Sequence, residues 1–308
     1  MKKILFAASE CVPFIKTGGL ADVVGSLPKS FDKEEYDVRV IIPKYMCIDQ
    51  KWKDQKISPK EYLNYCITQH WIDISQLNVD EKYADSTEVY DALCQYVGII
   101  ELEYEGVKIY FIDNEYYFGG EKPYSDARYD LEKFAFFSRA VLSALPVIDF
   151  RPDVIHCHDW HTGLIPVYLK DSFASGEFYQ GIKTIMTIHN LKFQGVWDID
   201  TIKDIAGLSD YYFTSDKLKD YDNGNYLKGG IVYADMVTTV SDTYAEEIKT
   251  PFFGEGLDGL LRARSNCLRG IVNGIDYDEY NPATLTRTSQ RLISEKKRLK
   301  TKQHFRKN

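Results

Sequence analysis

The chain has 308 residues, 44% of them hydrophobic and 27% charged, a globular composition that excludes disordered, collagen-like and fibrous proteins. Its formal net charge of −8 averages two unlike segments, because residues 283–308 carry nine Lys or Arg and one Glu, whereas residues 1–282 carry 29 Lys or Arg against 45 Asp or Glu. A body with a net charge of −16 argues against a nucleic-acid or anionic-membrane partner.

The N-terminus and the cysteines indicate a cytoplasmic protein. The first apolar run leads into Ser9-Glu10 without a small-residue cleavage site, so it predicts a buried strand and not a signal peptide. No apolar run reaches the roughly 18 residues that suggest a membrane span. The six cysteines include no C-x-x-C pair, which favours reduced thiols over a disulfide framework.

The first part of the chain predicts a β-α-β unit. Lys2–Ala8 is a continuous apolar run typical of a strand buried on both faces of a sheet. Leu20–Phe31 has apolar positions at helical spacing, and Val38–Ile42 resumes the strand pattern. Residues 44–96 are expected to be a variable insertion of short strands, with alternation in Tyr62–Ile67.

The middle of the chain predicts a hairpin and a helix. Val97–Leu102 and Val107–Ile112 flank a short turn and read as two antiparallel strands. Asp113–Asp130 is rich in Tyr and Gly and is expected to be a loop. Leu131–Leu145 predicts an amphipathic helix that Pro146 stops.

Strands and helices alternate through the rest of the chain. The predicted elements are strand Asp153–Cys157, helix Thr162–Ala174, strand Lys183–Ile188, helix Tyr226–Tyr233, strand Met236–Val240 and a capped helix starting at Ser241 or Asp242. Such alternation is typical of an α/β protein with a doubly wound, Rossmann-like parallel sheet.

Polar residues follow four of the predicted strands. In doubly wound sheets, ligands bind outside the carboxyl ends of the strands. The sequence therefore predicts one ligand cleft built from the loops after several strands. The polar groups concerned are Ser9-Glu10, His156–His161, His189-Asn190 and Ser241-Asp242.

The segment Lys16-Thr17-Gly18-Gly19-Leu20 suits an anion such as phosphate. Two glycines allow close backbone approach, a helix N-terminus offers N–H groups, and a lysine adds positive charge. The pattern is neither the Rossmann nor the Walker motif. The alternative is a plain strand-to-helix turn with a solvated lysine.

Two histidine-containing segments allow several interpretations. His156–His161 holds three His and one Asp, so a metal site and a set of buried, hydrogen-bonded histidines are both considered. His189-Asn190 offers donors and acceptors for a hydroxyl-rich ligand, with Phe193 near enough to stack on a sugar; a turn-forming Asn and a structural His are the alternative. Phe253–Gly259 is rich in glycine and is expected to be a loop that can close.

Taken together, six motifs resemble those of bacterial glycogen/starch synthases, in the same order. They are S-E-x-x-P-x-x-K-T-G-G-L-A-D-V (Ser9–Val23), P-D-V-I-H-x-H-D-W-H-x-G (Pro152–Gly163), T-I-H-N-L-x-x-Q-G (Thr187–Gly195), Y-L-K-G-G-I-x-Y-A-D (Tyr226–Asp235), T-V-S-x-T-Y-A-x-E-I (Thr239–Ile248) and V-N-G-I-D (Val272–Asp276). The resemblance covers residues 1–282 and implies the N-terminal, acceptor-side domain of a GT-B glycosyltransferase.

The resemblance also implies a reaction and its residues. The family transfers glucose, with retention, from ADP-glucose to the non-reducing end of an α-1,4-glucan such as glycogen, without a metal or other cofactor. Asp159 and His189 match catalytic residues that contact the transferred glucose. The expected substrate-binding residues are Lys16, Gly18 and Gly19 at the donor, and Glu10, Tyr124 and Asn190 as sugar or glucan contacts. In this reading, the histidine cluster recognises sugar rather than a metal.

The end of the sequence departs from the resemblance. Family members continue into a second domain that holds the adenosine and the pyrophosphate, so this chain is expected to lack that domain and to have little or no activity alone. Residues 283–308 are expected to be irregular. A shifted reading frame is one explanation, because Lys300–Asn308 can be back-translated to give N-K-T-A-F-Q-K-E; a short paralogue with a solvated basic tail and a nucleic-acid-binding tail are the others.

Two further functional hypotheses stay open at this point. One is a non-catalytic glucan-binding module that keeps the acceptor surface. The other is a related GT-B enzyme with a different donor, such as UDP-glucose, since the missing half sets the donor base.

Overall fold

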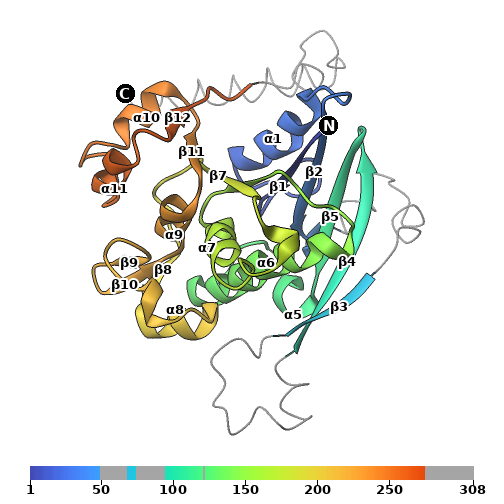
Figure 1. Cartoon of the computed structure of the whole chain (residues 1–308), viewed down its shortest axis with the longest axis horizontal. Helices are drawn as coiled ribbons and strands as arrows, with labels where there is room; N and C mark the ends of the chain where they lie inside the picture. Colours follow the sequence, from blue (N-terminus) through green and yellow to red (C-terminus); the bar gives the residue numbers. More distant parts are fainter. Residues whose placement is uncertain (49–67, 74–93, 121, 275–308) are drawn as a thin grey trace, which may run out of the picture. The chain divides into compact units, whose positions relative to one another are not determined.

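The computed structural model describes residues 1–48, 68–73, 94–120 and 122–274 (Figure 1). The chain divides into two compact units, residues 1–272 and residues 273–308. The first unit contains every helix and strand described below. The alternation predicted at Tyr62–Ile67, the domain boundary predicted at residue 282 and the basic tail all lie outside the described residues.

A mixed sheet forms the centre of the first unit, and nine strands of the described chain belong to it, in the order β12-β11-β7-β6-β1-β2-β5-β4-β3. All neighbours from β12 to β5 are parallel, whereas β4 and β3 add antiparallel. The strands are β1 (Lys2–Ala7), β2 (Tyr36–Pro43), β3 (Thr68–Asp73), β4 (Cys94–Tyr104), β5 (Val107–Asp113), β6 (Val154–His158), β7 (Lys183–Ile188), β11 (Met236–Thr239) and β12 (Leu268–Gly270).

The apolar composition of β1 follows from its position inside the sheet. It pairs with β2 on one side and β6 on the other, so that Ile4 lies opposite both Val38 and Val154. Leu5 and Phe6 point to opposite faces of the sheet and both are fully buried. The predicted doubly wound parallel sheet is therefore confirmed.

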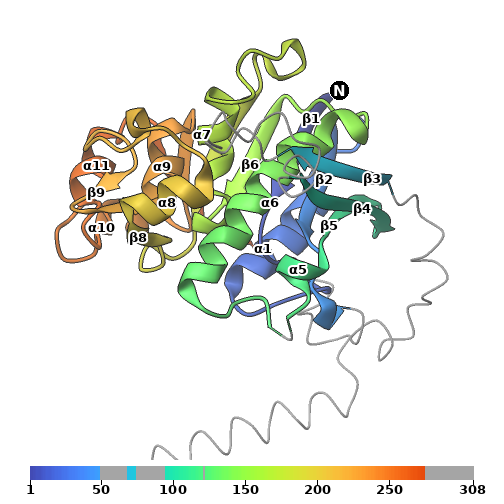
Figure 2. The ribbon, with the colours of Figure 1, turned by 90° about the horizontal axis from the view of Figure 1, so that it is seen from below.

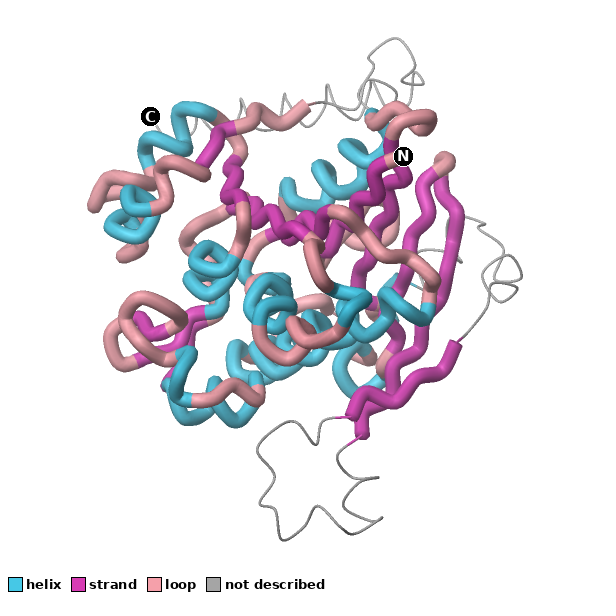
Figure 3. The backbone as a smooth tube through the Cα atoms, in the orientation of Figure 1, coloured by secondary structure: helices cyan, strands magenta, loops and turns pink. Residues whose placement is uncertain are grey.

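Helices cover both faces of this sheet. Figures 1 and 3 show α1 on one face and α6 and α7 on the other. In Figure 2, α8 to α11 gather near the β12 end of the sheet, and β3 and β4 form its opposite end. The α-helices are α1 (Gly19–Ser26), α5 (Glu115–Phe118), α6 (Ala127–Val147), α7 (Leu164–Lys170), α8 (Ile199–Ala206), α9 (Tyr226–Tyr233), α10 (Asp242–Glu247) and α11 (Asp258–Ala263); a small sheet is formed by β8 (Val196–Asp198), β9 (Lys219–Asp220) and β10 (Asn223–Asn225).

Helix α6 is longer at both ends than the predicted Leu131–Leu145. It begins earlier because the Asp126 carboxylate caps it, accepting hydrogen bonds from the N–H groups of the first turn. It also continues through Pro146, which was predicted to stop it. Pro146 has no N–H for the Leu142 carbonyl, and the Tyr179 hydroxyl donates to that carbonyl instead, at 3.0 Å.

Three other predicted boundaries were wrong. The predicted helix Leu20–Phe31 ends as an α-helix at Ser26 and continues as a 3₁₀ turn around Pro28. The predicted loop Asp113–Asp130 contains α5 and the first turn of α6. The helix predicted to span Thr162–Ala174 is shorter at both ends: α7 begins at Leu164, after a separate 3₁₀ turn, and ends at Lys170. Strands β6, β7 and β11 and helix α9 lie within one residue of their predicted bounds, whereas β8, β9, β10 and β12 were not predicted.

Candidate active site

The predicted polar groups lie along one edge of the sheet. Strands β11, β7, β6 and β1 are adjacent and parallel, so their carboxyl ends meet at the same edge. Glu10 follows β1, Asp159 follows β6 and His189 follows β7. The predicted gathering of these residues at one edge is therefore confirmed.

Hydrogen bonds of Asp159 connect the C-terminal ends of β6 and β7. Its Oδ1 accepts hydrogen bonds from the backbone N–H groups of His189 (2.7 Å) and Asn190 (3.4 Å), while its own N–H donates to the Thr187 carbonyl. Its φ of 55° lies in the left-handed region, which costs an L-residue conformational energy. Burial raises the pKa of Asp159 to about 7, although the two N–H donors oppose the shift.

His158 and His189 form a hydrogen-bonded imidazole pair. The Nδ1 of His158 lies 2.9 Å from the Nε2 of His189, and the rings stack with their centroids 5.2 Å apart. Burial lowers the pKa of His189 to about 4 and that of His158 well below its usual range, so both rings are neutral at pH 7.

The network around His158 indicates its tautomer. The Nε2 of this fully buried ring has no hydrogen-bond partner among the described residues. A proton on Nδ1 makes the bond to His189 and leaves a lone pair, not an N–H, unpaired in the core. His189 then carries its own proton on Nδ1, where it can donate to a ligand oxygen.

His156 adds a third ring to the row formed by His189 and His158. It stacks on His158 at 4.2 Å and its Nε2 bonds the Thr187 hydroxyl at 2.5 Å. In the described ranges, no group of three or more His, Cys, Asp or Glu is placed to hold a metal ion. The rings contact each other and Thr187 rather than converging on a common point.

Glu10 joins the loop after β1 to the loop before α6. One of its carboxylate oxygens accepts the Thr17 hydroxyl at 2.6 Å, and the other accepts the Thr17 N–H. The Tyr124 hydroxyl also bonds Glu10 and lies 2.9 Å from the Ser9 hydroxyl. Two of the predicted sugar contacts, Glu10 and Tyr124, therefore lie in direct contact with each other.

The loop Lys16–Gly19 is exposed at the start of α1. Lys16 Nζ lies 2.6 Å from the Asp22 carboxylate, and 42% of the lysine side chain is exposed. Gly18 is the N-cap of α1, with no side-chain cap, and a Cβ added at Gly18 or Gly19 would meet no atom within 4 Å. The packing of the described chain therefore does not require glycine here and leaves space for a ligand over the helix N-terminus.

An aromatic group supports the Tyr124 ring. Tyr124 stacks on His161 at 5.0 Å, and Phe134 meets His161 edge to face. Trp160, next to His161 in the sequence, packs against Gly195. The φ of Gly195 is 67°, and a Cβ added there would lie 2.3 Å from the indole ring. Gly195 therefore allows the loop after β7 to lie against Trp160.

Asn190 and Gln194 have separate roles in the loop after β7. The exposed Asn190 accepts the Lys192 N–H at its Oδ1 (3.1 Å), which closes a local turn. The Gln194 amide donates to the Glu255 carbonyl and accepts from Asn225, so it links this loop to the glycine-rich segment. The predicted loop Phe253–Gly259 extends only to Leu257, because α11 begins at Asp258.

Sequence reasoning missed three residues of this site. Thr17 was treated only as part of the glycine turn, His158 only as a member of the histidine cluster, and Gln194 only as a letter in a motif. The alternation H-x-H on a buried strand was a usable signal for His158, because residues two apart share one face. No pattern marks Thr17, although its partner Glu10 is only seven residues away. Gln194 links segments 31 and 61 residues away, which no local signal reveals.

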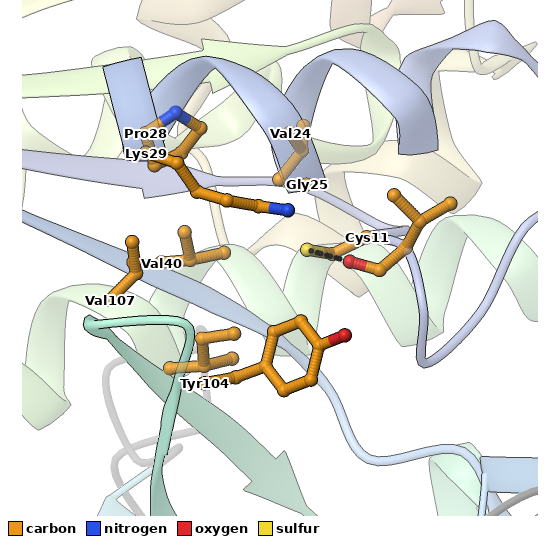
Figure 4. Close-up of a pocket in the computed structure, with 10 residues that line it drawn as sticks. Cys11, Val24, Gly25, Pro28, Lys29, Val40, Tyr104 and Val107 are labelled. Carbon is orange, nitrogen blue, oxygen red and sulfur yellow. Dashed lines mark hydrogen bonds between the residues drawn. The ribbon is translucent and has the colours of Figure 1, made fainter. Parts of the chain in front are cut away.

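A small cavity lies apart from these groups, between α1 and the strands. Figure 4 shows Cys11, Lys29 and Tyr104 around it, with the Cys11 thiol bonded to the Val12 carbonyl at 3.3 Å. The cavity has room for about one water molecule. The cavity is too small to hold a sugar.

Comparisons with known proteins agree on one family. A model of the family described as "Starch synthase catalytic domain" matches residues 3–263. The glycogen synthase of Lachnospira eligens is 65% identical over 284 residues, which cover 92% of this chain and 54% of that protein. The glycogen synthase of Lachnoclostridium phytofermentans is 60% identical over 282 residues, with the same two shares covered.

A solved structure agrees with the fold. The catalytic domain of starch synthase IV from Arabidopsis thaliana, bound to ADP and acarbose, superposes with a TM-score of 0.73 at 29% identity. The match covers 92% of this chain and 53% of that one. The chain thus spans about half the length of the curated relatives it matches. No helix in the described ranges is long and apolar enough to cross a membrane.

Proposed function

Because the chain belongs to the starch synthase catalytic domain family, we propose that it provides the acceptor-side half of a glycogen synthase. The reaction is transfer of glucose, with retention, from ADP-glucose to the non-reducing end of an α-1,4-glucan. The glycogen synthases of Lachnospira eligens and Lachnoclostridium phytofermentans each match 92% of this chain.

The observation that carries the proposal is the edge formed by Asp159, His158 and His189. A neutral His189 whose Nε2 accepts from His158 keeps an Nδ1–H donor for a sugar hydroxyl. Asp159 holds the backbone of His189 through a hydrogen bond of 2.7 Å, which fixes the position of that donor. In its ionised form, the Asp159 carboxylate also adds negative charge where an oxocarbenium-like transition state develops positive charge.

The loop Lys16–Gly19 is proposed to bind the donor phosphates. The uncapped N-terminus of α1 presents N–H groups and a partial positive charge, and the Lys16 ammonium, which is paired with Asp22 in this structure, lies in the same loop. The open space over Gly18 and Gly19 allows the diphosphate to approach the backbone. This arrangement supplies positive charge to the leaving group without requiring a metal or other cofactor.

The glucan is proposed to lie near Tyr124, at the edge of the sheet where the strands end. Tyr124 and His161 are stacked there, and the exposed Asn190 follows the same sheet edge. The neutral, hydroxyl-rich polymer has no charge for the acidic body to repel. The cytoplasm is the compartment in which we expect this reaction.

Adding the other half of a relative tests the proposal. The second half of the Lachnospira eligens glycogen synthase, produced separately, is mixed with this chain, and incorporation of labelled glucose from ADP-glucose into glycogen is measured. We expect little turnover from either half, because a cleft with one wall admits water, and clear turnover from the mixture. The matched control is the His189→Ala chain, which should give no turnover in the mixture.

A glucan-binding module without catalysis is the competing function, and the half-length match to the relatives keeps it open. Sedimentation of the chain with glycogen, but no turnover when the second half is supplied, would favour that function. Equal turnover with UDP-glucose and ADP-glucose would instead point to a different donor.

A further inference from the structure

We propose that Glu10, Thr17 and Tyr124 form a clasp that positions the donor loop Lys16–Gly19 and couples it to the loop before α6. In this account, Glu10 and Tyr124 are positioning residues, and their polar atoms do not contact the sugar. That the loop Lys16–Gly19 binds the sugar donor rests on the proposed function, whereas the contacts among Glu10, Thr17 and Tyr124 do not depend on it.

The Glu10 carboxylate is already occupied by groups of this chain. Glu10 is only 3% exposed, and its two oxygens accept the N–H and the hydroxyl of Thr17 and the hydroxyl of Tyr124. Leaving a buried carboxylate group without its hydrogen-bond donors is costly. A sugar hydroxyl would therefore have to displace a donor that is already well placed.

The contact with Thr17 holds the residue that immediately precedes the two glycines of the loop. Gly18 and Gly19 lack side chains, and space for a Cβ at either position is open. Thr17 immediately precedes them and is held at both its N–H and its hydroxyl. Glu10 therefore sets the direction in which the backbone enters the N-terminus of α1.

Tyr124 reaches Glu10 from a rigid support. The Lys133 ammonium, which is 2% exposed, lies 2.7 Å from the Asp130 carboxylate and donates to the Pro123 carbonyl at 2.7 Å. Asp130 in turn accepts the N–H of Ser125 at 3.0 Å. The residues on both sides of Tyr124 are thus tied to the first turns of α6.

The Tyr124 hydroxyl stays protonated and acts as a donor. Burial and the neighbouring Glu10 raise the pKa of Tyr124 well above its usual range. The Tyr124 ring, which carries this hydroxyl, stacks on His161. A shift of the ring on the glucan side is therefore transmitted through one hydroxyl and one carboxylate to Thr17.

Hydrogen exchange of the chain itself tests the clasp without any assumption about catalysis. Exchange is followed in a peptide that covers residues 14–20 for the wild type, Thr17→Val, Thr17→Ser and Tyr124→Phe. We expect exchange to become about tenfold faster or more in Thr17→Val and Tyr124→Phe, and to stay near the wild-type rate in Thr17→Ser, which keeps the hydroxyl. Tyr179→Phe is the matched control, because it removes a tyrosine hydroxyl that bonds the Leu142 carbonyl of α6.

A second measurement separates positioning from direct contact. In the mixture of the two halves, Tyr124→Phe should raise the KM for ADP-glucose severalfold and leave sedimentation of the chain with glycogen unchanged. Unchanged exchange at residues 14–20 in Tyr124→Phe, with weakened glycogen binding, would overturn the clasp and make the hydroxyl a glucan contact. If the wild-type mixture is inactive, the exchange result still decides the clasp, so that the proposed function fails separately.

Discussion

Replacing Asp159 by Asn should make the protein more stable at neutral pH. The substitution keeps the shape of the side chain and an Oδ1 that can accept from the N–H groups of His189 and Asn190. It removes a charge that burial disfavours, since the pKa of Asp159 is raised from 3.8 to about 7. The variant therefore tests whether the carboxylate is held ionised at a cost in stability.

The size and the sign of the effect follow from the two pKa values. Below about pH 4 the carboxyl is protonated in both the folded and the unfolded chain, so its ionisation contributes nothing. As the pH rises from 3.8 towards 7, the unfolded chain releases the proton more readily, and the folded state becomes progressively less favoured. At about 1.4 kcal/mol for each pKa unit, the full loss is about 4 kcal/mol, complete above pH 7.

Urea unfolding followed by tryptophan fluorescence measures this loss. The free energy of unfolding of the wild type, minus that of Asp159→Asn, should fall by about 2–3 kcal/mol between pH 5 and pH 8. Comparing the two proteins at each pH cancels the titration of the buried histidines. A difference that stays constant within about 0.5 kcal/mol across this range would refute the buried, high-pKa carboxylate.

Three further predictions concern stability. Burial lowers the pKa of His161 to about 3, so between pH 6.5 and pH 4.5 only the unfolded chain gains a proton at this residue. In urea unfolding, His161→Phe should therefore reduce the loss of stability over this pH range by about 2–3 kcal/mol. A loss equal to that of the wild type would contradict this. Gly195→Ala should lower the melting temperature by several degrees, because of the indole contact and the positive φ, whereas Gly18→Ala should leave it nearly unchanged; equal effects would refute the difference between the two sites. Lys133→Met should cost about 3–5 kcal/mol by leaving Asp130 buried without its cation, and a cost below about 1 kcal/mol in chemical denaturation would show that the ion pair is not desolvated.

The central fold could be predicted because its signals are local. The apolar runs of β1 and β7 mark strands buried on both faces, and the Ser241 cap marks the start of α10. The continuation of α6 through Pro146 could not be predicted, because the Tyr179 hydroxyl that replaces the missing hydrogen bond comes from a distant segment. Its start could have been predicted, because the Asp126 cap is a local signal. The resemblance to glycogen/starch synthases, read from the six motifs, is confirmed by the family match.

The site was predictable in composition but not in connectivity. The rule that parallel strands meet at their carboxyl ends placed Asp159 and His189 at one edge, as the structure shows. The rule does not say that Asp159 uses its carboxylate on the backbone of His189, or that Glu10 is occupied by Thr17. Those facts depend on loop conformations, including a positive φ at Asp159, that no periodicity encodes. The roles of the individual residues remain predictions.

A chimera tests the central claim most directly. Residues 1–272 of this chain replace the matching part of the Lachnospira eligens glycogen synthase, to which the chain is 65% identical, and transfer of glucose from ADP-glucose to glycogen is measured. If this chain carries the acceptor-side half of the transfer site, the chimera should work within about tenfold of the parent enzyme, equivalent to about 1.4 kcal/mol in the barrier, and His189→Ala should abolish the activity. A folded chimera that transfers no glucose, or one that tolerates His189→Ala, would contradict the account.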